Sequence, residues 1–130
     1  MFQSLDFIYI PTADVDATAE RYVETLGAEV VWKVSGMGTT VANVRVSETG
    51  PAILLSGHLE GERPILIYRV DDYAAAVTSL RDGGISDIRE LEIPHGPCAS
   101  FVMEGGQRVA VYELVRPEVD EHFRGRNDEG

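Results

Sequence analysis

The sequence predicts an α+β fold made of two βαβββ repeats. Two observations indicate this fold. Apolar strand-like segments, an amphipathic helical segment and turn residues follow one another in the same order twice along the 130 residues. An offset of 58 positions (67 − 9 = 58) pairs Tyr9 with Ile67 and Asp14 with Asp72. Such self-similarity is the signature of a duplicated structural unit.

The first unit is expected at residues 4–57. Residues 5–11 form a short apolar run that favours a strand and that a proline ends. Residues 14–26 carry apolar side chains at three- and four-residue spacing, which predicts an amphipathic helix with Thr12 or Asp14 as its N-cap. Turn residues separate three further apolar runs, so strands are predicted at residues 28–35, 39–47 and 51–57.

The second unit is expected at residues 64–116 and completes a single domain over residues 1–117. A strand is predicted at residues 64–70, because this run is apolar and follows a polar loop. An alanine-rich helix is predicted at residues 71–82, which two consecutive glycines end. Three more strands are predicted at residues 87–93, 99–104 and 108–115.

The last segment, residues 118–130, differs in composition from the rest of the chain. It is acidic and has few apolar side chains, so it offers little to bury against a core. We therefore expect a flexible tail, with a short helical turn near residues 121–123.

Composition narrows the classes of partner. Twenty-two Asp and Glu against eleven Lys and Arg give a formal charge of −11, which argues against nucleic acid and anionic membranes and favours a cationic ligand. No apolar stretch approaches the ~18 residues that a membrane span needs. The single cysteine, Cys98, cannot form an internal disulfide, and the first residues lack the features of a signal peptide. A cytoplasmic protein is expected.

Several segments carry motifs of a known superfamily. They are Leu5-Asp6-Phe7-Ile8-Tyr9-Ile10-Pro11, Arg21-Tyr22, Leu26-Gly27-Ala28-Glu29-Val30-Val31, Tyr68-Arg69-Val70-Asp71-Asp72-Tyr73, Pro94-His95-Gly96-Pro97 and Tyr112-Glu113-Leu114. With these residues the chain resembles the vicinal oxygen chelate superfamily of glyoxalase I, extradiol dioxygenases and bleomycin-resistance proteins. The resemblance covers roughly residues 4–117 and implies curled, mixed sheets that form a cup, with one helix on the convex side of each half. It implies a fold more firmly than a function, because this superfamily hosts many activities.

Enzymes of this superfamily usually hold a divalent metal with two side chains from each half. The resemblance places Phe7 where the family's first-strand histidine stands, and Ile65 at the matching position of the second half. On the last strand of each half it places Leu55 and Glu113. Three of these four side chains are apolar and cannot ligate a metal. The resemblance therefore implies a metal-free site with no cofactor, closest in character to the bleomycin-resistance proteins.

Alternation of side chains along the strands turns one set toward the cup. The candidate ligand-binding residues are Phe7, Tyr9, Trp32, Asn43, Arg45, Leu55, Ile65, Arg69, Phe101 and Glu113. They predict an apolar, aromatic pocket with a few polar groups, as in many small-molecule sites. Glu113 is the candidate catalytic residue, as a general base or acid, or else a counter-ion for a bound cation. Two alternatives stay open: the apolar residues fill a closed core, and Arg69 forms a salt bridge with Glu113.

Three functions fit these residues. The first is a metal-free, homodimeric binding protein that sequesters an aromatic or cationic small molecule, with antibiotic resistance as the implied role. The second is a glyoxalase-like or dioxygenase-like lyase or isomerase. Its site would be metal-independent and use Glu113, or would hold a divalent metal with His58 or His95 beside Glu113. The third is a structural or regulatory module whose cleft is filled.

Overall fold

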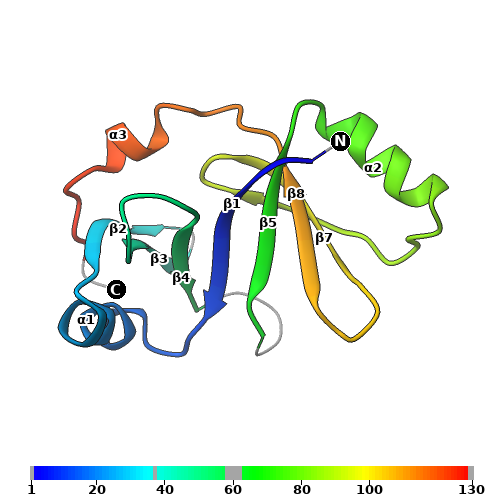
Figure 1. Ribbon diagram of the computed structural model, residues 1–130. Coiled ribbons are helices and arrows are strands. Elements are labelled where there is room, and N and C mark those ends of the chain that lie inside the picture. Colours follow the sequence, from blue (N-terminus) through cyan, green and yellow to red (C-terminus); the bar gives the residue numbers. More distant parts are fainter. Residues whose placement is uncertain (1, 37, 58–62, 129–130) are drawn as a thin grey trace.

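The computed structural model describes residues 2–36, 38–57 and 63–128 (Figure 1). Within them, eight strands form one mixed sheet in the order β2-β3-β4-β1-β5-β8-β7-β6. The elements are β1 (Phe2–Pro11), α1 (Val15–Leu26), β2 (Glu29–Gly36), β3 (Thr39–Arg45), β4 (Ala52–Ser56), β5 (Ile65–Val70), α2 (Tyr73–Asp82), β6 (Arg89–Ile93), β7 (Gly96–Val102), β8 (Arg108–Tyr112) and α3 (Val119–Phe123). The predicted βαβββ order is confirmed in both halves.

The two halves meet at the centre of the sheet, where β1 and β5 run antiparallel. In each half the first strand lies parallel to the last, β1 beside β4 and β5 beside β8. Phe7 lies opposite Ile67 and Tyr9 lies opposite Ile65, so the offset of 58 positions that pairs the repeats also interchanges these two contacts. The register is therefore that of a two-fold related pair of units.

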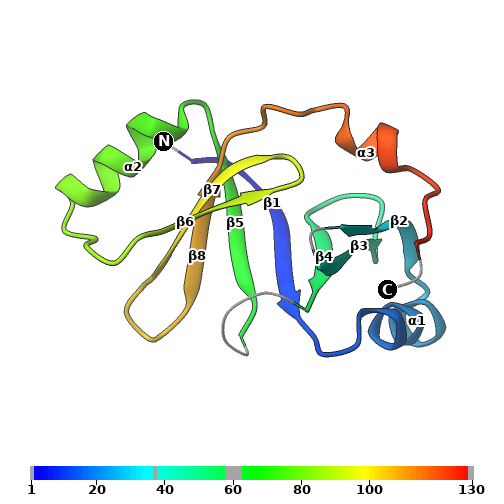
Figure 2. The same cartoon turned by 180° about the vertical axis from the view of Figure 1, so that it is seen from behind.

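Helices α1 and α2 cover the convex face, one for each half (Figures 1 and 2). Each begins at an aspartate: the side chain of Asp14 accepts a hydrogen bond from the backbone N–H of Ala17, and that of Asp72 does the same for Ala75. Such N-caps satisfy otherwise unpaired N–H groups and contribute about 1 kcal/mol each. Gly27 ends α1 in the left-handed conformation, with a φ of 67°, which glycine adopts without strain.

Three apolar clusters divide the interior. Helix α1 packs on one of them through Val15 and Ala19, and helix α2 packs on another through Ala76 and Val77. The third cluster fills much of the concave side of the sheet and is rich in aromatic residues. It includes Cys98, whose thiol has a pKa raised to about 12, first by burial and then by the charge of Glu92. Cys98 is thus a small buried residue of the core.

The C-terminal segment differs from the expected flexible tail. Figures 1 and 2 show it running from the second half across to the first, with α3 and α1 on opposite sides of strands β2–β4. Beyond α3 the chain follows the edge strand β2: the N–H of Lys33 donates to the carbonyl of Arg126 over 2.8 Å, and the N–H of Asp128 donates to the carbonyl of Lys33 over 3.0 Å. Main-chain pairing to an open sheet edge holds this acidic segment, although it brings few apolar side chains.

No described helix is both long and apolar enough to cross a membrane.

Candidate functional site

The concave side of the sheet holds a cavity of about 330 Å³, which α3 borders. Its walls carry the rings of Phe7, His95 and Tyr112, the amide of Asn43 and the charged groups of Asp6, Glu29, Arg45, Asp120 and Arg124. Aromatic walls with a few converging polar groups are typical of small-molecule sites. This cavity is the candidate site.

Asp120 on α3 gathers three polar side chains of this region. Its Oδ1 atom accepts hydrogen bonds from Trp32 Nε1 over 3.0 Å and from Asn43 Nδ2 over 3.4 Å, and it lies 3.0 Å from His95 Nε2. Burial of Asp120 raises the pKa of its carboxyl, but the hydrogen bonds from His95 and Trp32, together with the charges of His95 and Arg124, outweigh burial and lower that pKa. The carboxylate is therefore ionised at neutral pH and acts only as an acceptor.

The ionised carboxylate fixes the tautomer of His95. Because Asp120 Oδ1 can only accept, the Nε2 atom of His95 carries a proton, and in the neutral form of the ring the Nδ1 atom holds a lone pair. Nδ1 has no hydrogen-bond partner among the described residues, nor has Oδ1 of Asn43. Both side chains are buried, with exposures of 1% for His95 and 3% for Asn43. An unpaired buried polar atom costs about 1–3 kcal/mol, so these two acceptors fit a ligand that supplies donors.

A second polar group lines the same cavity. The hydroxyl of Tyr112 donates to Asp6 Oδ2 over 2.5 Å, and Ser4 Oγ donates to Asp6 Oδ1 over 2.6 Å. Arg69 Nε lies 3.5 Å from Asp6 Oδ2. Burial, and next the hydrogen bond to Asp6, raise the pKa of Tyr112, so its hydroxyl stays protonated at neutral pH. This wall therefore presents a neutral phenol in front of an ion pair.

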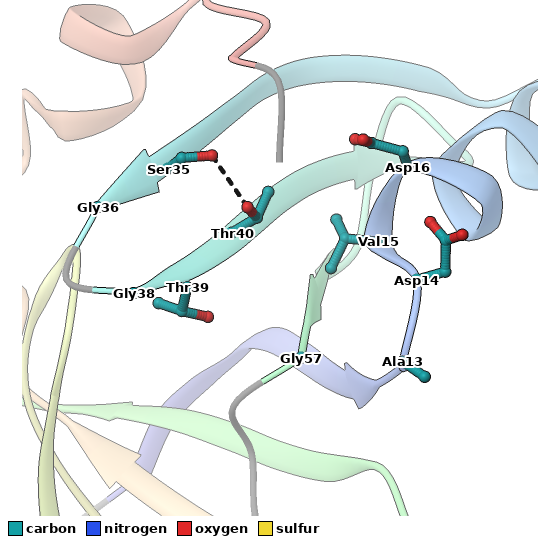
Figure 3. Close-up of a pocket in the computed structure, with 10 residues that line it drawn as sticks. All are labelled: Ala13, Asp14, Val15, Asp16, Ser35, Gly36, Gly38, Thr39, Thr40 and Gly57. Atoms are coloured by element: carbon teal, nitrogen blue, oxygen red, sulfur yellow. Dashed lines mark hydrogen bonds between the residues drawn. The ribbon is translucent and has the colours of Figure 1, made fainter.

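Two other hollows lack such unpaired groups. One, of about 460 Å³, lies outside the cup between the start of α1 and the β2–β3 hairpin (Figure 3). Small and acidic residues line it, among them Asp14 and Asp16, and no aromatic ring does. The other, of about 550 Å³, lies along α3 with largely apolar walls. None of the three unpaired buried side-chain atoms that the described residues contain belongs to the lining of either hollow.

The folds of three solved structures match this arrangement. A methylmalonyl-CoA epimerase from Mycobacterium tuberculosis is 21% identical over 88% of this chain and 89% of that one, with a TM-score of 0.71. A variant of the Streptomyces coelicolor methylmalonyl-CoA epimerase in complex with 2-nitronate-propionyl-CoA is 18% identical over 88% and 99% of the two chains, with a TM-score of 0.71. Methylmalonyl-CoA epimerase in complex with methylmalonyl-CoA and NH4+ is 18% identical over 89% and 97%, with a TM-score of 0.72.

The chain has the vicinal oxygen chelate fold. At these identities the likeness shows the fold alone, and it confirms the α+β class expected from the sequence. No protein-family model and no curated protein matches the sequence. The likeness to bleomycin-resistance proteins stays a prediction.

The resemblance implies that related enzymes hold a divalent metal, and the residues of this chain do not fit such a site. Phe7 and Ile65 offer no donor atom, and both lie in the concave apolar cluster. In the part of the chain that the structure describes, no three His, Cys, Asp or Glu side chains gather to hold a metal ion. His95 is buried in the cup while Glu113 faces α2, so the alternative metal site with these two residues is wrong. His58, the other histidine considered, lies outside the described residues.

The structure places the predicted binding residues in different parts of the fold. Phe7, Tyr9, Trp32 and Ile65 belong to the concave cluster, while Asn43 and Arg45 line the cavity together with Phe7. Arg69 lies beside Asp6 and not beside Glu113, so the predicted Arg69–Glu113 salt bridge is wrong. The remaining three residues, Leu55, Phe101 and Glu113, face the helices.

Strand pairing corrects the facing of these three positions. Leu54 lies beside Tyr9 on the concave face, so Leu55, one residue further along β4, faces the helices. Tyr112 belongs to the same concave cluster, so Glu113 after it faces the helices as well. Leu55 packs under α1, and Phe101 on β7 packs under α2. Glu113 follows the end of β8, and its Oε1 atom accepts a hydrogen bond from the N–H of Tyr73 over 2.8 Å, at the start of α2. It is a helix-capping group and not a cavity residue.

Sequence reasoning missed Asp120, Asp6 and Tyr112 as cavity residues, and it considered His95 only as a possible metal ligand. Asp120 belongs to the segment expected to be flexible, and only the return of that segment over the cup brings it to Trp32. The one sequence signal was the predicted helical turn near residues 121–123, which the structure confirms as part of α3 (Val119–Phe123).

Proposed function

We propose that this protein is a metal-free small-molecule-binding protein whose ligand has a flat aromatic body and carries N–H donors, most simply as a cation. The single observation that carries the proposal is the pair of buried, unpaired acceptors, His95 Nδ1 and Asn43 Oδ1, on residues that line one cavity. A ligand with two donors would satisfy both atoms and recover the cost of burying them.

Charge supports a cationic ligand. Asp120 lines the cavity as an ionised carboxylate, and its contacts with the Trp32 indole and the Asn43 amide do not neutralise its charge. Arg45 also lines the cavity, but its guanidinium donates to the carbonyls of Glu48 and Gly50 over 3.4 and 3.0 Å. These donors are therefore already engaged by the protein and not directed to an anionic ligand. The whole chain carries a formal charge of −11, which attracts cations.

Ring geometry supports an aromatic ligand. Phe7 lies 4.4 Å from His95 and 5.3 Å from Tyr112, measured between ring centroids. Rings at these separations form a surface on which a further flat ring can stack, and a cation over such a surface gains about 0.5–2 kcal/mol. A methylmalonyl-CoA epimerase of this fold binds methylmalonyl-CoA, so small-molecule binding is within the repertoire of the fold.

The other functions have less support. The enzyme that would use Glu113 is not proposed, because this carboxylate caps α2. A module with a filled cleft does not fit a cavity of about 330 Å³. The homodimer and the cytoplasmic location stay predictions. Analytical ultracentrifugation that finds only monomer at micromolar concentration would contradict the dimer.

A matched pair of probes tests the proposed function. Benzamidine and benzoate share one aromatic ring, but the first presents N–H donors and a positive charge while the second presents only acceptors and a negative charge. Trp32 is the only tryptophan, and its indole donates to Asp120, so its fluorescence reports on the site. We expect benzamidine to change this fluorescence saturably and benzoate to leave it unchanged. Equal or stronger binding of benzoate contradicts the proposal.

Asn43→Leu gives the matched variant, because it keeps the approximate size of the side chain and removes the unpaired acceptor. It should weaken benzamidine binding about tenfold, the loss expected for about 1.4 kcal/mol. Thr40→Val, at the far end of the same strand β3, is the control and should bind benzamidine as the unmodified protein does. Unchanged binding in Asn43→Leu contradicts the role of this acceptor.

A further inference from the structure

His95 is held in place from its backbone outward. It stands between β6 and β7, where its carbonyl accepts hydrogen bonds from the N–H groups of Val115 and Arg116 over 3.1 and 3.0 Å. The next residue must be small: a Cβ atom on Gly96 would lie 2.0 Å from the carbonyl oxygen of Glu113. The backbone at His95 and Gly96 is therefore fixed against the segment that follows β8, and the ring of His95 has a defined position in the cup.

The environment of the ring is that of an oriented base. Asp120 on α3 accepts the proton of Nε2, which leaves the lone pair on Nδ1. The rings of Phe7, Trp32 and Tyr112 surround the imidazole at 4.4, 6.3 and 6.4 Å between centroids. The other charged or titratable groups of the cavity are Asp6 behind Tyr112, and Glu29, Arg45 and Arg124 on the walls. None of them pairs with Nδ1.

A carboxylate that fixes the tautomer of a histidine and stabilises its protonated form is a recurrent arrangement for proton transfer. We propose that His95 is a general base of this cavity, which takes a proton at Nδ1 from a bound carbon acid, with Asp120 as its positioning residue. This inference rests on the proposed function, because the acid must first bind in the same cavity. It adds a metal-free reaction to a site so far described as binding only.

The step is balanced without a co-reactant. The C–H bond of the acid breaks, its electron pair stays with the acid, and the proton forms an N–H bond at Nδ1. The resulting imidazolium faces the Asp120 carboxylate, which stabilises the new positive charge. Release of the proton to solvent returns the neutral ring.

A nitrobenzisoxazole is a suitable probe, because it is a flat aromatic carbon acid. When a base removes its ring proton, that C–H electron pair forms the nitrile, the N–O bond breaks and a coloured nitrophenolate is released. We expect the protein to accelerate this elimination, with a rate that rises with pH as the base loses its proton. Quenching of Trp32 fluorescence by the same probe measures its binding independently.

His95→Gln separates catalysis from structure, because the amide can still donate to Asp120 but cannot take a proton. This variant should bind the probe and lose about 100-fold or more in rate, the range typical of a general base. His122→Gln is the matched control: this exposed residue of α3 lies against Phe123 and should keep the full rate. Asp120→Asn should slow the reaction and move the midpoint of its pH profile toward lower pH, because a neutral amide stabilises an imidazolium less.

The outcomes are distinct. An unchanged rate in His95→Gln, with binding retained, overturns the catalytic role and leaves the binding function standing. No acceleration by the unmodified protein despite binding does the same. No quenching of Trp32 by the nitrobenzisoxazole and none by benzamidine overturns the proposed function, and this inference falls with it. If His95→Gln loses its circular dichroism spectrum, His95→Asn replaces it, with the same expected loss of rate.

Discussion

The indole N–H of Trp32 donates to the carboxylate of Asp120 over 3.0 Å and joins residues that are 88 positions apart. The tryptophan belongs to β2 and is fully buried, whereas the aspartate belongs to α3, which returns over the cup after the last strand. The same oxygen also lies 3.0 Å from His95 Nε2. One carboxylate thus joins the C-terminal segment to both halves of the fold and orients the polar groups of the cavity.

Asp120→Ala should therefore lower the free energy of unfolding. The substitution leaves the buried indole N–H of Trp32 without its acceptor, which costs about 1–3 kcal/mol. Urea unfolding followed by circular dichroism measures the loss, and a red shift of Trp32 emission in the folded protein reports water at the indole. Glu121→Ala on the exposed side of α3 is the control, with a change within about 0.5 kcal/mol. Equal stability of the two variants contradicts the role given to Asp120.

The pKa of Asp120 gives this contact a pH dependence. Its pKa is lower in the folded protein than the ordinary value of 3.8, so the contact contributes its stability above that value and loses it as pH falls below it. Between about pH 5 and about pH 3, the free energy of unfolding should therefore fall less steeply in Asp120→Asn than in the unmodified protein. Chemical unfolding across this range measures both slopes, and parallel slopes speak against a depressed pKa.

Glu113→Gln should change stability but not binding. The carboxylate accepts a hydrogen bond from the N–H of Tyr73 at the start of α2, where a negative charge interacts favourably with the positive end of the helix dipole. We expect a loss of about 0.3–1 kcal/mol in the free energy of unfolding, and benzamidine binding equal to that of the unmodified protein. Asp72→Asn, at the N-cap of the same helix, is the comparison. A marked loss of benzamidine binding in Glu113→Gln would indicate that Glu113 contacts the ligand, and it would contradict the place of this residue beside α2.

Metal removal should have no effect on binding. The cup presents Phe7 and Ile65 at the positions where the resemblance implies metal ligands, and neither side chain can donate to a cation. Protein purified without a His tag should hold less than about a tenth of an equivalent of any transition metal, and exhaustive chelation should leave benzamidine binding unchanged. Elemental analysis gives the first result and fluorescence titration the second. One tightly held equivalent per chain would show that other residues ligate a metal.

The order of the elements could be predicted from the sequence because local chemistry determines it. Periodic apolar residues mark α1, Asp14 and Gly27 mark its ends, and the repeat reveals the second half. The inward face of β1 and β5 was also predictable, because strand alternation holds across the pair Phe7 and Ile67. To predict which residues of the last strand face the cup, one must also know the register between the first and last strands of each half.

That register is not local, and it decides which residues of the last strands face the cup. The expected site residues Leu55 and Glu113 lie one position beyond the concave residues Leu54 and Tyr112, and one position along a strand turns a side chain to the other face. Asp120 was missed for a similar reason. Nothing in the composition of residues 118–130 indicates that their backbone pairs with β2, because an unpaired sheet edge can hold a segment of almost any sequence.

Proton–nitrogen NMR of the His95 ring tests the central claim most directly, since that claim concerns which ring atom can accept a hydrogen bond in the cavity. The Nε2 atom should carry the proton in the free protein at neutral pH, and Nδ1 should have the shift of an unprotonated nitrogen. Adding benzamidine should move the Nδ1 resonance toward that of a hydrogen-bonded acceptor and leave the Nε2–H pairing with Asp120 in place. A proton on Nδ1 in the free protein, or an Nδ1 resonance that saturating benzamidine does not move, would contradict it.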